Sequence, residues 1–343
     1  MKILWLQFVE SYLKIGFQFY YKSIRAYYSE KIPKDKAVLF LSNHQNALLD
    51  PLLISVKSTR KNFFLTRAKV FSNPIVARVL NSLQMLPVYR MVDGINTIQK
   101  NKEIFSICSE LLHKKQSIIM FPEGSHSLNR SVRPLSKGFT RIIEETLQKY
   151  PETEIVIIPI GVNYQDPIAY GDSMSIYFGK HIDPLDYYQE NVLDVPKLKD
   201  AVSNEIKKLT THIKPGLEYE NTLTNLKDLK VDFTNPTEIN KYLEHDVNYT
   251  GKQVRANSTL FTFLKTCIII IYSIPYLIWK KVAAPKVKEL EFMSTFRYTL
   301  IITLAPIFLI IEVAILTLLF GKTIGLTVLF IGFLLPLLAL KVK

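Results

Sequence analysis

The sequence predicts an α/β domain, a central mostly β-sheet flanked by helices, joined to a membrane region at its C-terminal end. Two observations predict this fold class. Short apolar runs alternate with longer amphipathic stretches between residues 37 and 213, which is typical of strands and helices packed in layers. Beyond residue 259 the chain becomes strongly apolar over stretches long enough to cross a bilayer.

The composition supports this division. The 343 residues carry a formal net charge of +13, and 48% of them are hydrophobic although 21% are charged. So much charge and so much apolar surface in one chain indicate a charged body and a separate apolar region. The two cysteines, Cys108 and Cys267, exclude a disulfide scaffold and a four-cysteine zinc site.

Residues 1–30 are rich in aromatic residues and carry scattered charges. They lack the apolar core and the small-residue cleavage site of a signal peptide. We expect an amphipathic helix that lies on the membrane, although a helix packed on the domain core fits the pattern equally well.

Residues 31–214 are expected to form the α/β domain. Several of its apolar runs are continuous enough to be strands that are buried on both faces of the sheet. The predicted strands are 37–42, 62–66, 117–121, 154–160 and 173–178. The predicted helices are about 70–83, 94–115, 137–149 and 194–213.

The remainder of the chain is divided by polarity. Residues 215–258 are polar and are expected to form a linker or a small peripheral subdomain. Within the membrane region, 259–343, two apolar runs at 298–320 and 323–340 predict a transmembrane hairpin. A third run, 260–279, either spans the membrane or is re-entrant. The basic residues after it favour the re-entrant arrangement, which places them and the α/β domain together on the cytoplasmic face.

The first candidate site follows the strand at residues 37–42. His44 comes directly after this strand, and Asp50-Pro51 opens a helical run in which Asp50 suits the N-cap position. A carboxylate that bonds one ring nitrogen of a histidine orients the ring as a general base. Positions six apart lie about 240° around a helix, so this pair requires a turn. The alternative is a capping Asp and an unrelated loop His.

A second candidate site follows the strand at residues 117–121. The chain continues with Pro-Glu-Gly, a tight turn whose backbone N–H groups can face an anion. Arg133, Lys137 and Arg141 follow at a spacing of four and would form one basic face of a helix. Such a face either binds an anion or is simply solvated.

A third candidate site is marked by Arg90 at the end of an apolar stretch, with Arg67 upstream. The sequence contains no P-loop, no G-x-S-x-G elbow and no metal-ligand spacing.

Taken together, these blocks resemble the glycerolipid acyltransferase family, the 1-acylglycerol-3-phosphate acyltransferase (PlsC-type) group. All four family motifs occur in order within residues 38–165. The first, N-H-x4-D, corresponds to Asn43, His44 and Asp50; the second ends in Arg90; the third, F-P-E-G-T-R-S, corresponds to 121–127; the fourth, an apolar strand with a proline, corresponds to 157–160.

The chain departs from the family pattern at two places. Five residues rather than four separate His44 from Asp50, which is similar to the branch that includes yeast-type glycerol-3-phosphate acyltransferases. His126 stands where the third motif has an arginine, so Arg130, Arg133 or Lys137 would replace that cation at the substrate phosphate.

The resemblance implies a glycerolipid acyltransferase-like fold and an acyl transfer without a bound cofactor or metal. His44 would take the proton from a hydroxyl of lysophosphatidic acid, and Asp50 would orient His44. The alkoxide would attack an acyl thioester, either acyl-CoA or acyl carrier protein, without a covalent acyl-enzyme. The implied substrate-binding residues are Asn43, Arg67, Arg90, Glu123, Gly124, Ser125, His126, Arg130, Arg133 and Lys137.

The resemblance leaves alternatives open. A glycerol-3-phosphate 1-O-acyltransferase and a lysophospholipid acyltransferase share these motifs, and a catalytically inactive membrane lipid-binding adaptor is the non-enzyme alternative. The expected partners are the acyl donor, a phosphorylated glycerol or lyso-lipid acceptor, and an anionic membrane surface, to which the net charge of +13 is attracted. No nucleic acid is expected, since the basic residues form no basic-aromatic motif.

Overall fold

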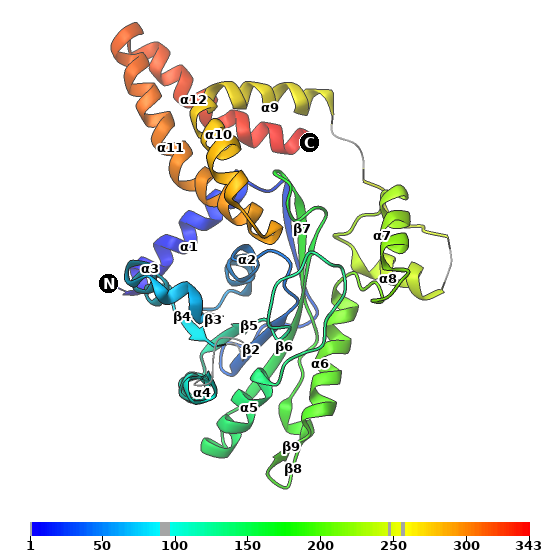
Figure 1. Ribbon diagram of the computed structural model, residues 1–343. Helices are drawn as coiled ribbons and strands as arrows, with labels where there is room; N and C mark the ends of the chain where they lie inside the picture. Colours follow the sequence, from blue (N-terminus) through cyan, green and yellow to red (C-terminus); the bar gives the residue numbers. More distant parts are fainter. Residues whose placement is uncertain (1, 90–96, 246–247, 255–257) are drawn as a thin grey trace.

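The computed structural model describes residues 2–89, 97–245, 248–254 and 258–343 (Figure 1). A seven-stranded sheet with the order β1-β7-β6-β2-β5-β3-β4 forms its centre, and within this sheet β6–β7 is the antiparallel pair among the described strands. A second, two-stranded sheet pairs β8 (Tyr188–Gln189) with β9 (Val192–Leu193). The strands are β1 (Ser23–Tyr28), β2 (Ala37–Ser42), β3 (Asn62–Arg67), β4 (Met85–Val88), β5 (Ser117–Met120), β6 (Ile155–Tyr164) and β7 (Ser173–Phe178). The predicted fold class, a central sheet flanked by helices, is confirmed.

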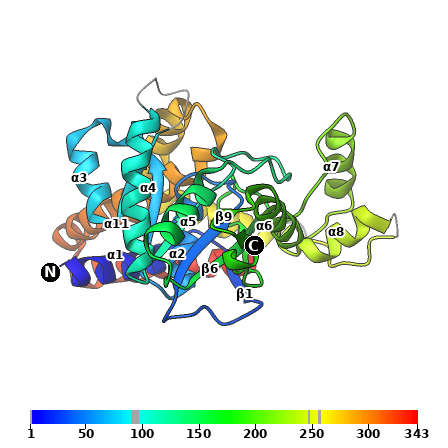
Figure 2. The ribbon, with the colours of Figure 1, turned by 90° about the horizontal axis from the view of Figure 1, so that it is seen from below.

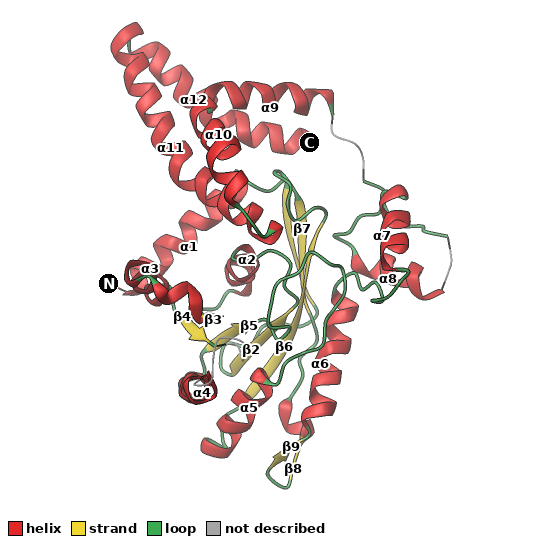
Figure 3. Ribbon diagram, viewed as in Figure 1, coloured by secondary structure: helices red, strands yellow, loops and turns green. Residues whose placement is uncertain are grey.

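Alternate residues of β2 face two separate hydrophobic cores, as the period of two in a strand requires. Val38 and Phe40 pack with α1 (Lys2–Gln18) and α2 (Leu49–Ser58). Leu39 and Leu41 pack on the opposite face of the sheet. Figure 3 shows helices on both faces of the sheet. Those on the Leu39 face are α4 (Thr97–His113), α5 (Gly138–Lys149) and α6 (Val195–Leu209).

The central strands β2, β5 and β6 are buried at every position, which explains their uninterrupted apolar sequences. Because β2 is parallel to both β5 and β6, the carboxyl ends of these three strands meet at one edge of the sheet. The loops that leave this edge are therefore neighbours although they are far apart in the sequence.

Two strands of the central sheet were not predicted. The chain between residues 23 and 28 forms β1, so the N-terminal helix ends at Gln18 instead of extending toward residue 30. The short strand β4 precedes Arg90 and pairs with β3. Both strands lie at the outer edges of the sheet, where half of the backbone pairing is lost and the sequence signal is weak. That α1 lies on a membrane stays a prediction.

The polar segment after the α/β domain is a small subdomain with a core of its own. Helices α7 (Tyr219–Asp228) and α8 (Pro236–His245) bury Leu226 and Ile239 together. Figure 2 shows this pair of helices beyond α6, at the side of the molecule.

The C-terminal region is helical. The hairpin consists of α11 (Met293–Phe320) and α12 (Lys322–Val342), which are each long and apolar enough to cross a membrane. Gly321 turns the chain between them with φ of 91°, a conformation that favours glycine. The third apolar run is bent by 99° between α9 (Thr259–Ile271) and α10 (Ser273–Leu277) and its continuation, so it forms either a broken span or a re-entrant loop.

Candidate active site

His44 and Asp50 form a bonded pair at the carboxyl end of β2. His44 Nδ1 lies 2.7 Å from Asp50 Oδ2, and the Asp50 side chain is fully buried. The carboxylate also accepts hydrogen bonds from the backbone N–H groups of Gln45 at 2.8 Å and Asn46 at 2.7 Å. The turn between the two residues therefore folds around the carboxylate and brings it to the histidine. Nε2 is then the ring nitrogen left to take a proton from a substrate.

The position of Asp50 in its helix differs from the expected N-cap. The α2 helix begins at Leu49, its N-cap residue is Leu48, and Asp50 lies in the first turn. The Asn46 carbonyl accepts the N–H groups of Leu49 and Asp50, so the turn continues into the helix without a side-chain cap. This arrangement releases the carboxylate from capping and leaves it for His44.

Tyr164 holds the second oxygen of the Asp50 carboxylate. Its hydroxyl donates to Asp50 Oδ1 at 2.6 Å from the end of β6. Tyr164 was not among the predicted site residues, because the strand was predicted to end at residue 160, whereas β6 continues to Tyr164. Its place at the carboxyl end of a buried strand was the available signal.

The loop after β5 packs against His44. The Phe121 ring stacks on the imidazole with centroids 3.9 Å apart, and the Ser127 N–H donates to the His44 carbonyl at 2.9 Å. The hollow beside His44 has a volume of about 10 Å³, room for about one water-sized group. It is lined by Asn43, His44, Gln45, Glu123, Ser127, Asn129, Arg130, Ser131, Val132 and Thr210.

Asn43 and Arg130, which were expected to bind substrate, each bond the backbone around β6. Asn43 donates to the Val162 carbonyl at 3.0 Å and accepts from the Val162 N–H at 2.8 Å. Arg130 donates to the carbonyls of Tyr164 and Gln165, each at 3.0 Å, and its guanidinium lies 3.6 Å from the centre of the Phe233 ring. Burial lowers the pKa of Arg130 to about 10, so it stays positive beside the hollow at neutral pH.

Glu123 and Arg133 form an ion pair inside the turn of the third motif. Arg133 Nη2 lies 2.7 Å from Glu123 Oε2, and only 3% of the Glu123 side chain is exposed. Burial raises the pKa of Glu123 above its ordinary value, although Arg133 opposes this effect. Arg133 Nη1 also donates to the Ser125 hydroxyl at 2.6 Å, and Gly124 turns the backbone with φ of 76°.

The expected basic face of a helix does not form. The α5 helix begins at Gly138, so Arg133 lies before it and turns inward to Glu123, while Lys137 and Arg141 are exposed. A buried carboxylate without a partner is strongly destabilising, which explains why Arg133 turns toward Glu123. Arg67 is the last residue of β3, and Arg90 lies outside the described residues.

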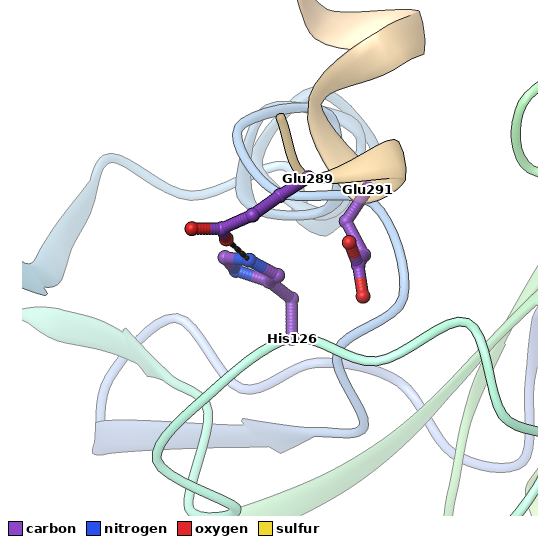
Figure 4. Close-up of side chains that lie close together, drawn as sticks. All are labelled: His126, Glu289 and Glu291. Atoms are coloured by element: carbon purple, nitrogen blue, oxygen red, sulfur yellow. Dashed lines mark hydrogen bonds and ion pairs between the residues drawn. The ribbon is translucent and has the colours of Figure 1, made fainter. Parts of the chain in front are cut away.

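His126 contacts a segment from the membrane region. Its Nε2 lies 2.8 Å from Glu289 Oε2 (Figure 4). The Phe292 and His126 rings are in edge contact, with centroids 4.9 Å apart. The His126 ring lies edge-on to His44, with centroids 5.6 Å apart. The segment that precedes α11 therefore covers the site, an approach across more than 160 residues that no local pattern could indicate.

His126, Glu289 and Glu291 also bring possible metal-ligand atoms within 4.8 Å of one another (Figure 4). Glu289 is mostly exposed, and nothing else at this position points to an ion. We assign no metal to this group.

The sequence around this site is similar to that of known proteins. Residues 23–163 match the model of the Acyltransferase family. This segment contains the His44–Asp50 pair and the third motif, so the chain carries an acyltransferase domain and the resemblance to the glycerolipid acyltransferase family is confirmed.

Two curated relatives share part of the chain. The 1-acyl-sn-glycerol-3-phosphate acyltransferase BAT2, chloroplastic, of Brassica napus is 29% identical over 118 residues, which cover 34% of this chain and 32% of the relative. The Arabidopsis thaliana enzyme LPAT1, chloroplastic, is 29% identical over 118 residues that cover 34% of this chain and 31% of the relative. The chain thus spans about a third of the length of the curated relatives it matches.

Among solved structures, the 1-acyl-sn-glycerophosphate acyltransferase PlsC from Thermotoga maritima superposes with a TM-score of 0.44 at 19% identity. The superposition covers 59% of this chain and 76% of that chain.

Proposed function

We propose that this protein is a membrane O-acyltransferase that transfers a fatty acyl group from an acyl thioester to the hydroxyl of lysophosphatidic acid, which yields phosphatidic acid. The observation that carries the proposal is the 2.7 Å bond between His44 Nδ1 and the buried Asp50 carboxylate, inside the segment that matches the family. The printed names of the curated relatives support this acceptor.

The reaction follows from this pair. His44 Nε2 takes the proton of the acceptor hydroxyl while Asp50 holds the opposite nitrogen and stabilises the imidazolium. The hydroxyl oxygen attacks the thioester carbonyl carbon, a C–O bond forms, and the C–S bond then breaks. The departing thiolate takes the proton back from His44, so the base is restored and the products are an ester and a free thiol.

A covalent cysteine intermediate does not fit the structure. Cys108 is completely buried on α4, and burial raises the pKa of its thiol to about 12, so the reactive thiolate is absent at neutral pH. Cys267 lies on α9, in the membrane region. The direct attack of the acceptor hydroxyl is therefore the step we propose.

The membrane attachment fits a lipid acceptor. We propose that α11 and α12 anchor the chain and that the acyltransferase domain lies on the cytoplasmic face. The basic residues that follow α10, among them Lys280 and Lys281, would then lie on the same side. The acyl donor we propose is acyl-CoA or acyl carrier protein.

A second acceptor is supported by one feature. The extra residue between His44 and Asp50 is similar to the branch that acylates glycerol-3-phosphate. The test uses the purified full chain in detergent with palmitoyl-CoA or, in parallel, palmitoyl-acyl carrier protein, and offers lysophosphatidic acid and glycerol-3-phosphate in separate reactions. Phosphatidic acid formed from the first acceptor is the expected product. Product from glycerol-3-phosphate alone would move the enzyme to the first acylation step, and no transfer with either donor class would overturn the proposal.

A further inference from the structure

A large apolar cavity lies between the membrane helices and the acyltransferase domain. Its volume of about 680 Å³ is that of a site for a small organic ligand. Its walls come from α1, α9, α10, α11, α12 and the loop after β6. Every one of its lining residues lies outside residues 23–163, so the cavity is no part of the segment that matches the family.

Three cations line this cavity: Lys265, Arg297 and Lys343. Arg297 Nη1 donates to the Ile168 carbonyl at 2.9 Å, and Lys343 Nζ donates to the carbonyls of Tyr170 and Gly171, each at 2.7 Å. Among the described residues, none of the three forms an ion pair with a carboxylate within 4.0 Å. Arg297 also lies 5.0 Å from the centre of the Trp279 ring, and Lys343 lies 5.8 Å from the centre of the Phe261 ring. Carbonyls and rings accept these cations without neutralising them, and unneutralised cations near a membrane mark a site for an anionic ligand.

Two carboxyl groups, Asp166 and Asp172, lie near Lys343, and neither forms an ion pair with it. Asp172 is buried next to the loop after β6, and burial raises its pKa to about 8. Asp172 is therefore mostly protonated at neutral pH, and in this neutral form it does not cancel the positive charge of Lys343.

The cavity has a charged end and an apolar end. Arg297 and Lys343 bond to the loop that continues from β6, so the charged end faces the acyltransferase domain. Leu309 and Phe333 line the cavity between the two helices of the hairpin, toward the apolar end. A ligand with an acyl chain and a phosphate matches this division of polarity.

The charged end adjoins the His44 site through a single loop. The Pro167 carbonyl accepts a hydrogen bond from Asn46 Nδ2 at 2.9 Å and another from the Ser294 hydroxyl at 2.7 Å. Asn46 belongs to the turn that holds Asp50, and Ile168 to Tyr170 line the cavity. On the other side, Phe292 touches His126, and Arg297 follows five residues later, about 7 Å along a helix.

We infer that this cavity holds the acyl chain of lysophosphatidic acid, with the phosphate at Lys265, Arg297 and Lys343, so that the acceptor reaches His44 from the membrane side. The inference rests on the proposed function. It also accounts for the small volume of the hollow beside His44, about 10 Å³, because the acyl chain and the phosphate of the acceptor would lie in the large cavity.

The first test locates the lipid. Lysophosphatidic acid with a diazirine in its acyl chain is photo-crosslinked to the full chain in nanodiscs, and the labelled peptides are identified by mass spectrometry. We expect label on the cavity walls, competed by unlabelled lysophosphatidic acid, in wild type and equally in His44→Ala. Label confined to the outer faces of the hairpin would overturn the inference, and so would stronger labelling of the same peptides by a diazirine acyl-CoA.

A matched pair of variants on α11 gives a second test. Ala305 lines the cavity, whereas Ala314 is exposed on the same helix. We expect Ala305→Trp to abolish the competed label and to raise the KM for palmitoyl-lysophosphatidic acid by about tenfold, with Ala314→Trp like wild type. Equal behaviour of the two variants would contradict the inference.

The charge is tested in the same way. Lys265→Gln should raise this KM by about tenfold, as expected for a lost charge-assisted contact, and Lys322→Gln at the hairpin turn should not. An unchanged KM in Lys265→Gln would remove that residue from the site. Cavity labelling without acyl transfer to any acceptor would support the lipid site while overturning the proposed function, so the two failures are distinguishable.

Discussion

Two hollows of this molecule differ in almost every property. The one beside His44 holds about 10 Å³ and is lined mainly by polar side chains, whereas the one among the membrane helices holds about 680 Å³ and is mostly apolar. The first lies at the carboxyl edge of the sheet, where parallel strands bring short polar loops together. The second lies between the membrane helices and the loop after β6. In our proposal, proton transfer and lipid recognition therefore take place in different parts of the chain.

The segment that leads into α11 lies against both regions. Glu289 and Phe292 contact His126 on one side, and Arg297 lines the large cavity on the other. A lipid bound in the cavity therefore lies against the segment that covers the catalytic pair.

The largest expected effect comes from the catalytic histidine. His44→Ala should lower turnover by about 10²- to 10⁴-fold, because no other group is bonded to Asp50 in a position to take the proton. His113→Ala, an exposed histidine at the end of α4, is the matched control. Initial rates with palmitoyl-CoA and lysophosphatidic acid measure both. Full activity in His44→Ala would place the chemistry elsewhere.

The next effect is on the stability of the fold and comes from Asp172, which is buried next to the loop after β6. The folded pKa of Asp172, about 8, lies above the ordinary value of 3.8 because of burial. The folded state therefore binds this proton more tightly, so the stabilisation is complete below about pH 4 and is lost as the pH rises through about 8.

Asp172→Asn removes this titration. The variant should be more stable than wild type by about 1 kcal/mol or more near pH 9, and its unfolding midpoint should change less with pH. The exposed Asp183→Asn substitution is the control, and thermal unfolding across the pH range is the measurement. Parallel pH profiles for Asp172→Asn and wild type would show that Asp172 is ionised in the folded protein.

A smaller effect is expected from the tyrosine that holds Asp50. Tyr164→Phe removes the 2.6 Å bond to Oδ1 but leaves the bond from Asp50 to His44. We expect a loss of about tenfold in kcat, as for one hydrogen bond to a charged group, with little change in KM. Tyr177→Phe, which loses a 3.1 Å bond to the Thr234 carbonyl, controls for the removal of a hydroxyl. A change in KM alone would mean that Tyr164 touches the substrate.

The smallest effect is expected where the two regions touch. Glu289 is 62% exposed, and an exposed ion pair with His126 contributes little. Glu289→Gln should therefore change kcat/KM by less than about fivefold, and Glu291→Gln in the same segment provides the comparison. A loss as large as that of His44→Ala would show that Glu289 takes part in the chemistry. It would contradict the proposal that the two regions have separate roles.

The sequence predicted the features that are local in the chain. The buried strands were evident from their unbroken apolar runs, and the His44–Asp50 pair was expected once a turn was allowed between them. The ion pair of Arg133 with Glu123 was not predicted, because Glu123 lies ten residues away and is buried only in the folded turn. The approach of Glu289 to His126 and the cavity of Arg297 depend on how the membrane helices pack on the domain, which no motif records.

One competition experiment tests the central claim, that the His44 site transfers the acyl group while the large cavity selects the lipid. Palmitoyl-lysophosphatidic acid and its hexanoyl analogue compete in one reaction, and mass spectrometry gives the ratio of the two products for wild type, His44→Ala and Ala305→Trp. We predict that His44→Ala lowers both products without a change in their ratio. Ala305→Trp should lower the palmitoyl product selectively, by about tenfold. An unchanged ratio in Ala305→Trp, or a changed ratio in His44→Ala, would contradict the account.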